Sequence, residues 1–276
     1  MDPNIFRTGL ATALNEQAFG NTYEPERSFW VGWFSAWNNQ RYLGYLRRTG
    51  VWGGDLLEVG IGSGSFLCAA RKAGFLVSGC DLSVSLCYRV EKETGISIHN
   101  GSIEKLPESR WDVLVMNHVL EHVHDPVAFL HAARNRLRPD GVLHIAVPNV
   151  ACWEATLLPG WTSYEPYHLG YFTLKTLERA VRASGFAIMY LGTHESFSGW
   201  FLTCLRTAMG VNRQGGAVEK HKGELAAYLR KVRPSVVEHV YRLAMVGAGA
   251  VLWPFRYVQA GLGYGDELIC VARKMN

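Results

Sequence analysis

The sequence predicts an α/β fold built on a doubly wound, mostly parallel sheet, and two observations support that prediction. From about residue 55 onward, short apolar segments alternate with segments of helical periodicity, which is the order of successive βαβ units. These apolar segments are continuous hydrophobic runs and do not alternate with polar residues, as expected for strands that helices cover on both faces.

The expected elements follow one another regularly along the chain. Strands are expected at residues 56–59, 75–80, 96–99, 111–116, 142–147, 186–191 and 267–272. Helices are expected between them at residues 65–73, 84–93, 126–137 and 173–184. A further helix is expected at residues 27–48, where Trp30, Trp33 and Trp37 recur near helical spacing. These three tryptophans either pack this helix onto the main domain or form one wall of a pocket for an apolar ligand.

Three regions follow from this order of elements. We expect an N-terminal helical cap at residues 1–50, a Rossmann-like domain at 51–194 plus 266–276, and a mostly helical insertion or lid at 195–265. An insertion of that length before the last strand is longer than a simple hairpin needs, and long insertions of this kind are usually functional.

Composition excludes several classes of protein. The chain has 276 residues, of which 48% are apolar and 19% charged, so overall disorder is excluded. The N-terminus lacks the pattern of a signal peptide, the apolar stretch at 243–255 is too short to span a bilayer, and the six cysteines form no CxxC pair. We therefore expect a cytoplasmic protein. The net charge is only +4, and the densest basic run, at 134–138, fits a solvated helix end, so no nucleic-acid partner is expected.

A glycine-rich turn follows the first expected strand. The sequence LLEVGIGSGSF from Leu56 places Gly60, Gly62 and Gly64 between a strand and a helix, where an open α/β sheet binds its ligand. The dinucleotide fingerprint GxGxxG is not matched, because the third glycine comes one residue early. Glu58 would also repel a pyrophosphate, whereas its carboxylate suits a ligand with an ammonium group, such as S-adenosylmethionine. An NAD(P)-dependent oxidoreductase is the alternative from another class.

Two further strand ends support the same ligand. Asp81 ends the second expected strand, where a carboxylate can accept both hydroxyls of a ribose. Ser102 and Ile103 follow the third expected strand, at a position that meets an adenine. These residues come in order at successive strand ends, and together they favour a nucleoside ligand over a structural interpretation of each residue alone.

The chain resembles the class I S-adenosylmethionine-dependent methyltransferases, and is most similar to the ubiquinone O-methyltransferase-like enzymes of small molecules. The resemblance covers about residues 54–192 and the last strand. It rests on LLEVGIGSGSF, on CDLS from Cys80, on GSIEKLP from Gly101 and on WDVLVMNHVLEHVHDP from Trp111, with LRPDGVLHIAVPN from Leu137 and HLGYFTLKTLERAVRASGF from His168. It implies a seven-stranded sheet of order 3-2-1-4-5-7-6 with an antiparallel last strand.

The resemblance also implies roles for individual residues. Glu58 and the three glycines would surround the methionine part of the cofactor, and Asp81 would hold the ribose with Leu82 beside the adenine. Ser102 and Ile103 would border the base. Asn117 and His118 would line the other side of the cofactor.

These features together predict a small-molecule methyltransferase, most consistent with O-methylation of an apolar or aromatic metabolite in specialised metabolite biosynthesis. N-methylation and a non-catalytic cofactor-binding protein are the alternatives within this architecture. The expected partner is a small-molecule acceptor, and the protein is expected to be a monomer or homodimer. The aromatic residues Phe197, Trp200 and Phe201 suggest either an apolar acceptor pocket or a subdomain core in the insertion. A membrane-surface contact through residues 231–257 is a less favoured alternative.

His168 is the expected general base. It lies after the fifth expected strand, on the side where the acceptor should approach, and histidine is the usual base at neutral pH. Glu165 or a nearby tyrosine would orient it. The alternative is that His168 fixes the loop through a hydrogen bond to the backbone.

The sequence HVLEH also suggests a metal site. If this segment is helical, His118, Glu121 and His122 would share one face and could bind a divalent ion. Related enzymes have an acid where this chain has His118, so we expect no bound metal.

Overall fold

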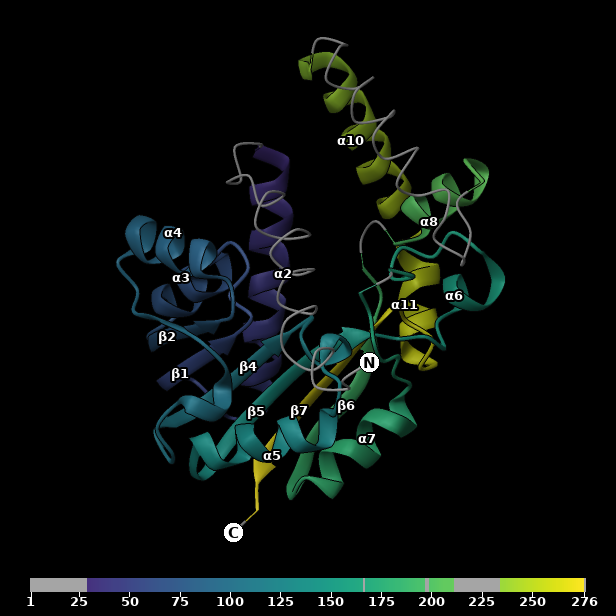
Figure 1. Ribbon diagram of the computed structural model, residues 1–276. Helices are drawn as coiled ribbons and strands as arrows, with labels where there is room; N and C mark the ends of the chain where they lie inside the picture. Colours follow the sequence, from purple (N-terminus) through teal and green to yellow (C-terminus); the bar gives the residue numbers. More distant parts are fainter. Residues whose placement is uncertain (1–28, 166, 197–198, 211–233, 276) are drawn as a thin grey trace, which may run out of the picture. The chain divides into compact units, whose positions relative to one another are not determined.

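The computed structural model describes residues 29–165, 167–196, 199–210 and 234–275. Seven strands form one sheet in the order β3-β2-β1-β4-β5-β7-β6 (Figure 1). They are β1 (Gly54–Val59), β2 (Phe75–Asp81), β3 (Ile98–Asn100), β4 (Trp111–Asn117), β5 (Leu137–Pro148), β6 (Phe186–His194) and β7 (Glu267–Lys274). The predicted fold class and strand order are confirmed.

The helices of the described residues follow the expected pattern. They are α2 (Phe29–Arg48), α3 (Ser65–Lys72), α4 (Val84–Thr94), α5 (Pro126–Arg136), α6 (Trp153–Leu157), α7 (Leu174–Ala183), α8 (Gly199–Ala208), α10 (Pro234–Val251) and α11 (Trp253–Gly261), with single turns η2 (Ile103–Lys105) and η3 (Leu120–His122). None of the helices in this part of the chain is long and apolar enough to cross a membrane.

The chain separates into two compact units, which are described one at a time below. The first comprises residues 1–146, 178–190 and 270–276, and the second comprises residues 147–177 and 191–269. The expected cap at 1–50 falls in the first unit and the expected insertion at 195–265 in the second, which also includes α6. Residues 1–28 of that cap lie outside the described residues, as do residues 197, 198 and 211–233 of the insertion, which include Phe197 and the first part of the 231–257 segment.

In the first unit, parallel strand pairing brings the candidate ligand-binding residues to one edge. β1 pairs in parallel with both β2 and β4, and β4 pairs in parallel with β5. Helices α3 and α4 lie on one side of these strands and α5 lies on the other (Figure 1). The carboxyl ends of β1, β2 and β4 therefore meet at the same edge, where ligands bind in open α/β sheets.

Local caps fix the helices that start at this edge. The Ser83 hydroxyl accepts a hydrogen bond from the backbone N–H of Leu86 at 3.3 Å and begins α4. Asp125 accepts one from Ala128 N–H at 3.0 Å and begins α5. These side chains satisfy N–H groups that the first turn of a helix leaves without partners, and so set where each helix begins.

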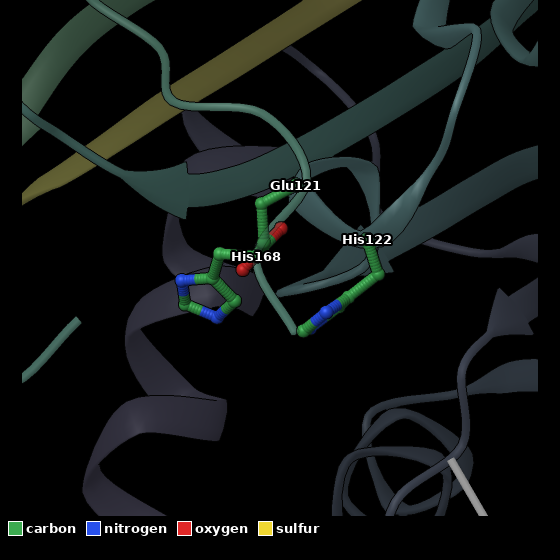
Figure 2. A group of neighbouring side chains, drawn as sticks. All are labelled: Glu121, His122 and His168. Carbon is green, nitrogen blue, oxygen red and sulfur yellow. The ribbon is translucent and has the colours of Figure 1, made fainter. Parts of the chain in front are cut away.

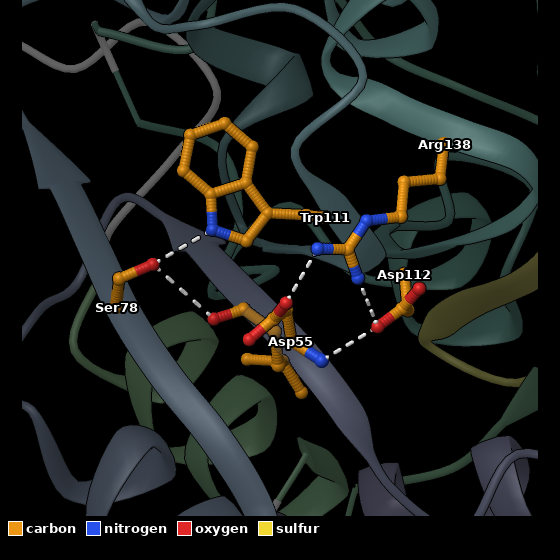
Figure 3. A network of polar contacts seen from close by, with 6 residues as sticks. Asp55, Ser78, Trp111, Asp112 and Arg138 are labelled. Carbon is orange, nitrogen blue, oxygen red and sulfur yellow. Dashed lines mark hydrogen bonds and ion pairs between the residues drawn. The ribbon is translucent and has the colours of Figure 1, made fainter.

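A polar network holds the opposite, amino-terminal ends of β1, β4 and β5 (Figure 3). The guanidinium of Arg138 donates to Asp55 and to Asp112, at 2.7 Å each, and Asp112 also accepts from the Asp55 N–H at 2.8 Å. Burial acts to raise the pKa of Asp112, but the hydrogen bonds from Asp55 and Arg138 outweigh it, so that the pKa lies below its usual value. The network fixes the register of these three strands, because each strand contributes one residue.

The start of β5 differs from the sequence expectation. The chain was expected to stay helical to residue 137 and to enter the strand only at 142, but Leu137 already pairs with Trp111. A register shift between Trp111 and Val113 accommodates the residues in between. Arg138 is extended as a result, and this places it beside Asp112.

Candidate active site

The turn after β1 is held in a left-handed backbone conformation by its glycines. The φ angles of Gly60, Gly62 and Gly64 are 75°, 50° and 76°, a region that favours glycine. A Cβ atom on Gly60 would lie 2.5 Å from Cγ2 of Val119, and one on Gly64 would lie 2.6 Å from Cγ1 of Val90. Glycine at these two positions is therefore required both by the backbone and by the close approach of the residues that follow β4 and of α4.

Glu58 is a buried carboxyl group near the end of β1. Its side chain is 3% exposed, and no hydrogen-bond partner within the described residues reaches its Oε2 atom. Burial is the main reason that the pKa of Glu58 lies well above its usual value; the nearby Asp81 raises it further, and a hydrogen bond with Asn117 acts in the opposite direction. A buried carboxyl oxygen without a donor is costly, and it is a natural acceptor for a cationic ligand group.

Asp81 links the turns that follow β1 and β2. Its Oδ2 accepts from the N–H of Ile61 at 3.1 Å, and its Oδ1 accepts from the N–H of Ser83 at 2.9 Å. Burial raises the pKa of Asp81, although these backbone hydrogen bonds oppose the effect. Each carboxylate oxygen can accept more than one hydrogen bond, so Asp81 can hold the turn and still accept from a diol.

The residues expected beside an adenine differ in their exposure. The side chain of Leu82 is 46% exposed, whereas that of Ile103 is buried in the core. The backbone oxygen of Ile103 accepts a hydrogen bond from Nε of Arg136 at 2.9 Å, which fixes the turn that begins at Ser102. The contact of these residues with a base remains a prediction.

His118 and Glu121 form a pair directly after β4. His118 has a φ of 56°, its side chain is 49% exposed, and its Nδ1 lies 3.4 Å from Oε1 of the buried Glu121. Burial acts to raise the pKa of Glu121, but the hydrogen bond from His118 and the charges of His118 and His122 outweigh it, so that the pKa is lowered. Figure 2 shows the Glu121 and His122 side chains on this segment.

The helical premise of the metal hypothesis is wrong. Only Leu120–His122 form a single 3-10 turn, and His118 lies before it in a left-handed conformation. The three side chains therefore do not follow the i, i+3, i+4 pattern of an α-helix. The expectation that no metal is bound remains a prediction.

A cavity of about 420 Å³ lies beside the glycine turn that follows β1, within the first unit. Its lining comes from α2, the residues Ser63–Ser65, α3 and α4, and includes the charged side chains of Lys72, Arg89 and Glu93. Asn39 of α2 donates to the Ser65 hydroxyl at 3.2 Å at one side of it. Of the residues expected to bind the cofactor, only Gly64 lines this cavity. One wall of it comes from α2, through Gly32, Ser35, Ala36, Asn39 and Gln40, whereas the tryptophans expected to form such a wall are not among its lining residues.

In the second unit, His168 is held by backbone hydrogen bonds. Its Nδ1 lies 2.8 Å from the carbonyl oxygen of Ser163, and its N–H donates to the oxygen of Glu165 at 3.1 Å. Because a carbonyl only accepts, Nδ1 carries the proton and Nε2 is the basic nitrogen of the neutral ring. The Glu165 carboxylate pairs with Arg206 at 3.6 Å. The orienting role expected of Glu165 or a nearby tyrosine therefore remains a prediction, and the contact that the structure shows at Nδ1 of His168 is the one with Ser163. His168 is also labelled in Figure 2.

Sequence reasoning missed a buried carboxyl cluster in the second unit. Glu154, Glu195 and Gln259 are at most 3% exposed, and Nε2 of Gln259 donates to Oε2 of Glu154 at 2.7 Å and of Glu195 at 3.0 Å. The N–H of Asp266 donates to Glu195 at 3.0 Å, and the hydroxyl of Ser196 donates to Asp266.

Burial raises the pKa values of two carboxyl groups in this cluster, those of Glu195 and Asp266. Burial, the charge of Asp266 and the hydrogen bond with Glu154 raise the pKa of Glu195 to about 12. Burial and the charge of Glu154 raise the pKa of Asp266 to about 7. The raised pKa keeps Glu195 a neutral acid at neutral pH, which limits the cost of burying this cluster.

The predicted site residues thus fall into two groups. The structure brings Glu58, Asp81 and Asn117 together with the glycine turn in the first unit, whereas His168 belongs to the second unit. Sequence reasoning also missed the N–H groups of Ile61 and Ser83 that fix Asp81. The Ile61 donor depends on the pairing of β1 with β2, which no sequence pattern reveals, whereas the Ser83 donor lies two residues after Asp81 in a local Asx turn.

The comparisons with known proteins agree on one kind of domain. A family model described as a methyltransferase domain matches residues 38–191. The ubiquinone biosynthesis O-methyltransferase of Actinobacillus pleuropneumoniae serotype 5b is 30% identical over 125 residues, which cover 40% of this chain and 53% of that protein. The one from Hydrogenovibrio crunogenus is 30% identical over 102 residues, covering 34% and 42%. The matches span about half the length of these curated relatives.

Solved structures share the fold at low sequence identity. A 1,6-didemethyltoxoflavin-N1-methyltransferase of Burkholderia thailandensis, solved with S-adenosylhomocysteine, has a TM-score of 0.57 at 16% identity and covers 100% of this chain and 92% of that chain. The [4+2]-cyclase SpnF has a TM-score of 0.52 at 18% identity, covering 86% and 80%. These similarities concern the fold alone.

Proposed function

Because the chain belongs to the class I S-adenosylmethionine-dependent methyltransferases, we propose that it transfers a methyl group to an oxygen of a small apolar or aromatic metabolite. S-adenosylmethionine is the cofactor of this family. The alternative of an NAD(P)-dependent oxidoreductase is set aside, since the matched family model is a methyltransferase domain and covers the whole glycine turn.

The single observation that carries the proposal is the buried oxygen of Glu58. Oε2 of Glu58 has no donor within the described residues, and it lies in a side chain that is 3% exposed, beside a turn of three glycines. The ammonium group of a methionine moiety supplies the missing donor and offsets the buried negative charge. A pyrophosphate would add a second negative charge to the same place.

Asp81 fits the ribose of the same cofactor. Each of its carboxylate oxygens accepts one backbone N–H and keeps capacity for one hydroxyl. The carboxylate is pre-positioned by these hydrogen bonds, so little side-chain freedom is lost on binding. Leu82, Ser102 and Ile103 would then border the adenine, and Asn117 and His118 would line the opposite side.

The work left to the chain is alignment and proton removal. When bound, S-adenosylmethionine supplies an electrophilic methyl group on a sulfonium centre. The protein residues hold the acceptor oxygen in line, exclude water and take the hydroxyl proton. Glu58 and Asp81 bind and orient the cofactor and take no part in the proton transfer.

We assign the proton transfer to Nε2 of His168. Its other nitrogen donates to Ser163, which fixes the tautomer that leaves Nε2 basic. The rings of Tyr167 and Tyr171 lie 5.3 Å and 6.0 Å from the His168 ring, and Tyr164 lies 5.9 Å from Tyr171. These aromatic surroundings support a planar, apolar acceptor.

Oxygen is proposed as the acceptor atom on two grounds. A hydroxyl needs a base before it attacks, and His168 can act as one. The matched curated relatives are named O-methyltransferases. A structural neighbour named as an N1-methyltransferase keeps nitrogen as the second candidate.

Calorimetry with S-adenosylhomocysteine tests the cofactor site. The wild-type chain is expected to bind, and Asp81→Ala is expected to weaken binding by about 10-fold or more, since hydrogen bonds to a charged group are lost. Glu91→Ala, which removes an exposed carboxylate from α4, is the matched control and should bind normally. Absence of binding by the wild-type chain would contradict the proposed function.

Replacement of His168 tests the base. With the acceptor identified by label transfer, His168→Ala should lower turnover by about 10²–10⁴-fold and leave affinity for S-adenosylhomocysteine unchanged. A rise in pH should restore part of the rate when the acceptor ionises by itself. His131→Ala, on the exposed face of α5, should keep full turnover. A His168→Ala protein that keeps full turnover, or that loses cofactor binding and melts earlier, refutes the assignment.

A further inference from the structure

Arg206 of α8 contacts the chain on both sides of Ser163, within the second unit. We call the described residues 160–165 and 167–168 the His168 loop. Nε of Arg206 donates to the backbone oxygen of Gly160 at 3.1 Å, and its Nη1 lies 3.6 Å from Oε1 of Glu165. The carbonyl oxygen of Ser163, which lies 2.8 Å from Nδ1 of His168, is thus flanked by the two residues that Arg206 contacts.

Gly160, at the start of the His168 loop, lies directly against α8. Its N–H donates to the hydroxyl of Thr207 at 3.2 Å, and its oxygen accepts from Arg206, so that both of its backbone polar groups bind α8. A Cβ atom on Gly160 would lie 2.5 Å from the backbone nitrogen of Thr207. Two hydrogen bonds and this close approach therefore fix the start of the loop on the helix.

Glu165 depends on Arg206 for its charge balance. The side chain of Glu165 is 12% exposed and that of Arg206 is 17% exposed. Removing one partner of a largely buried ion pair is costly, because the remaining charge then lacks both water and a counter-charge. The N–H of Glu165 donates to the oxygen of Ser163 at 3.0 Å, and its own oxygen accepts from the N–H of His168 at 3.1 Å. A shift of Glu165 would therefore move both the backbone of His168 and the carbonyl group that holds its ring.

A second set of contacts supports the His168 loop through aromatic packing. Trp161 is 1% exposed, and its ring centroid lies 4.9 Å from that of Tyr164. The hydroxyl of Tyr164 donates to the backbone oxygen of Ala155 in α6 at 3.3 Å. We expect these contacts to keep the loop folded when Arg206 is replaced, so that the effect of Arg206 on His168 can be measured in a folded protein.

We propose that Arg206 is a positioning residue for His168, so that α8 of the insertion takes part in the reaction. It holds Gly160 and Glu165, and through them the carbonyl group of Ser163 to which Nδ1 of His168 donates. A base acts only where its geometry is correct, and a misplacement of about 1 Å can lower a rate by about 10²-fold. The proposal rests on the proposed function for the role of His168 as the base, but the position of its ring can be measured without any reaction.

Arg206→Gln in the full chain tests the proposal through kinetics. With the acceptor identified by label transfer, kcat should fall by about 10- to 100-fold, whereas KM for the acceptor and the Kd of S-adenosylhomocysteine should stay unchanged. Arg206→Lys, which keeps a positive charge beside Glu165, should recover part of the loss. The double variant Arg206→Gln with Glu165→Gln should lose no more than Arg206→Gln alone, because the two residues act as one pair. Arg182→Gln, which breaks the exposed ion pair with Glu178 on α7, is the matched control and should keep full turnover.

Nuclear magnetic resonance of protein with isotope-labelled histidine measures the position of His168 without any reaction. The hydrogen-bonded Nδ1–H is protected from exchange with water, and its signal is identified by its absence from His168→Ala. This signal should be present in the wild-type protein, in Arg206→Lys and in Arg182→Gln, and lost in Arg206→Gln.

The two measurements separate this proposal from the proposed function. A wild-type protein without the Nδ1–H signal, or an Arg206→Gln protein that keeps it, overturns the positioning role. Loss of the signal with unchanged kcat supports the positioning role and refutes His168 as the base. Thermal unfolding at the temperature of Arg182→Gln shows that Arg206→Gln is folded. If Arg206→Gln unfolds earlier, Glu165→Gln carries the same test, and an undiminished signal in that variant overturns the proposal.

Discussion

Replacement of Glu58 by glutamine separates its role in ligand binding from its role in stability. The folded protein raises the pKa of Glu58 through burial and through Asp81, so the folded state binds this proton more tightly than the unfolded chain does. The stability that this group contributes is therefore present at low pH and is lost as pH rises above the unfolded value. Glutamine keeps the shape and carries no charge. We expect Glu58→Gln to be at least as stable as the wild-type protein at neutral pH.

Ligand affinity should change in the opposite direction. The carboxylate of Glu58 is buried, and a hydrogen bond to a charged group is worth about 1.5–3 kcal/mol. At about 1.4 kcal/mol per tenfold change, Glu58→Gln should raise the Kd of S-adenosylhomocysteine by about 10- to 150-fold. Binding of the ammonium group must also release the proton of Glu58. Wild-type affinity should therefore increase as pH rises through the raised pKa, and the variant should lack this dependence.

Isothermal titration calorimetry across pH, combined with urea unfolding, measures both effects on the same samples. Glu91→Gln on α4 is the control, since this exposed carboxylate should affect neither measurement. A Glu58→Gln protein that binds as tightly as the wild-type protein refutes the assignment of the ammonium group to Glu58. A variant that loses affinity only in proportion to a loss of stability refutes it as well, because the residue is then structural.

Two further predictions concern the turn and the buried carboxyl cluster. Gly60→Ala should lower the free energy of unfolding by more than about 2 kcal/mol, since a left-handed backbone alone costs a non-glycine residue about 1–2 kcal/mol and the new Cβ would also lie 2.5 Å from Val119. Adding Val119→Ala should restore part of this loss in urea unfolding. A loss that Val119→Ala does not reduce contradicts the packing argument. The pKa of Glu195 is raised to about 12, so the folded state holds a proton that the unfolded chain releases, and stability falls as pH rises. The free energy of unfolding of Glu195→Gln, measured in urea, should therefore rise relative to that of the wild-type protein by about 1.4 kcal/mol per pH unit above pH 5. Glu178→Gln, at an exposed carboxylate, should show no such trend. Parallel pH profiles of Glu195→Gln and the wild-type protein contradict the proton assigned to Glu195.

The strands and the first turn were predictable because they depend on local features, whereas the strand order was predicted only through the resemblance to a known family. Apolar runs place the strands, and glycines at 60, 62 and 64 occupy left-handed positions that few other residues adopt. Glu58 and Asp81 could be identified because each lies near the end of a strand in a parallel sheet. Their partners could not, since the N–H of Ile61 and the side chain of Asn117 reach them only through strand pairing.

The features that the sequence did not predict depend on long-range packing. The helical premise at residues 118–122 was wrong because the chain turns sharply at His118, whose φ of 56° no periodicity indicates. Gln259 donates hydrogen bonds to Glu154 and Glu195, which lie 105 and 64 residues away in the sequence, so this cluster follows only from the folded structure. The earlier start of β5 depends on the pairing of Leu137 with Trp111.

Label transfer from S-adenosylmethionine tests the central claim most directly. The full chain would be incubated with S-adenosylmethionine deuterated in its methyl group and with a metabolite extract, and products would be analysed by mass spectrometry. We predict a small apolar or aromatic product that carries the deuterated methyl group on oxygen and that is nearly absent with Asp81→Ala. Binding of S-adenosylhomocysteine without label in any small molecule would contradict the account.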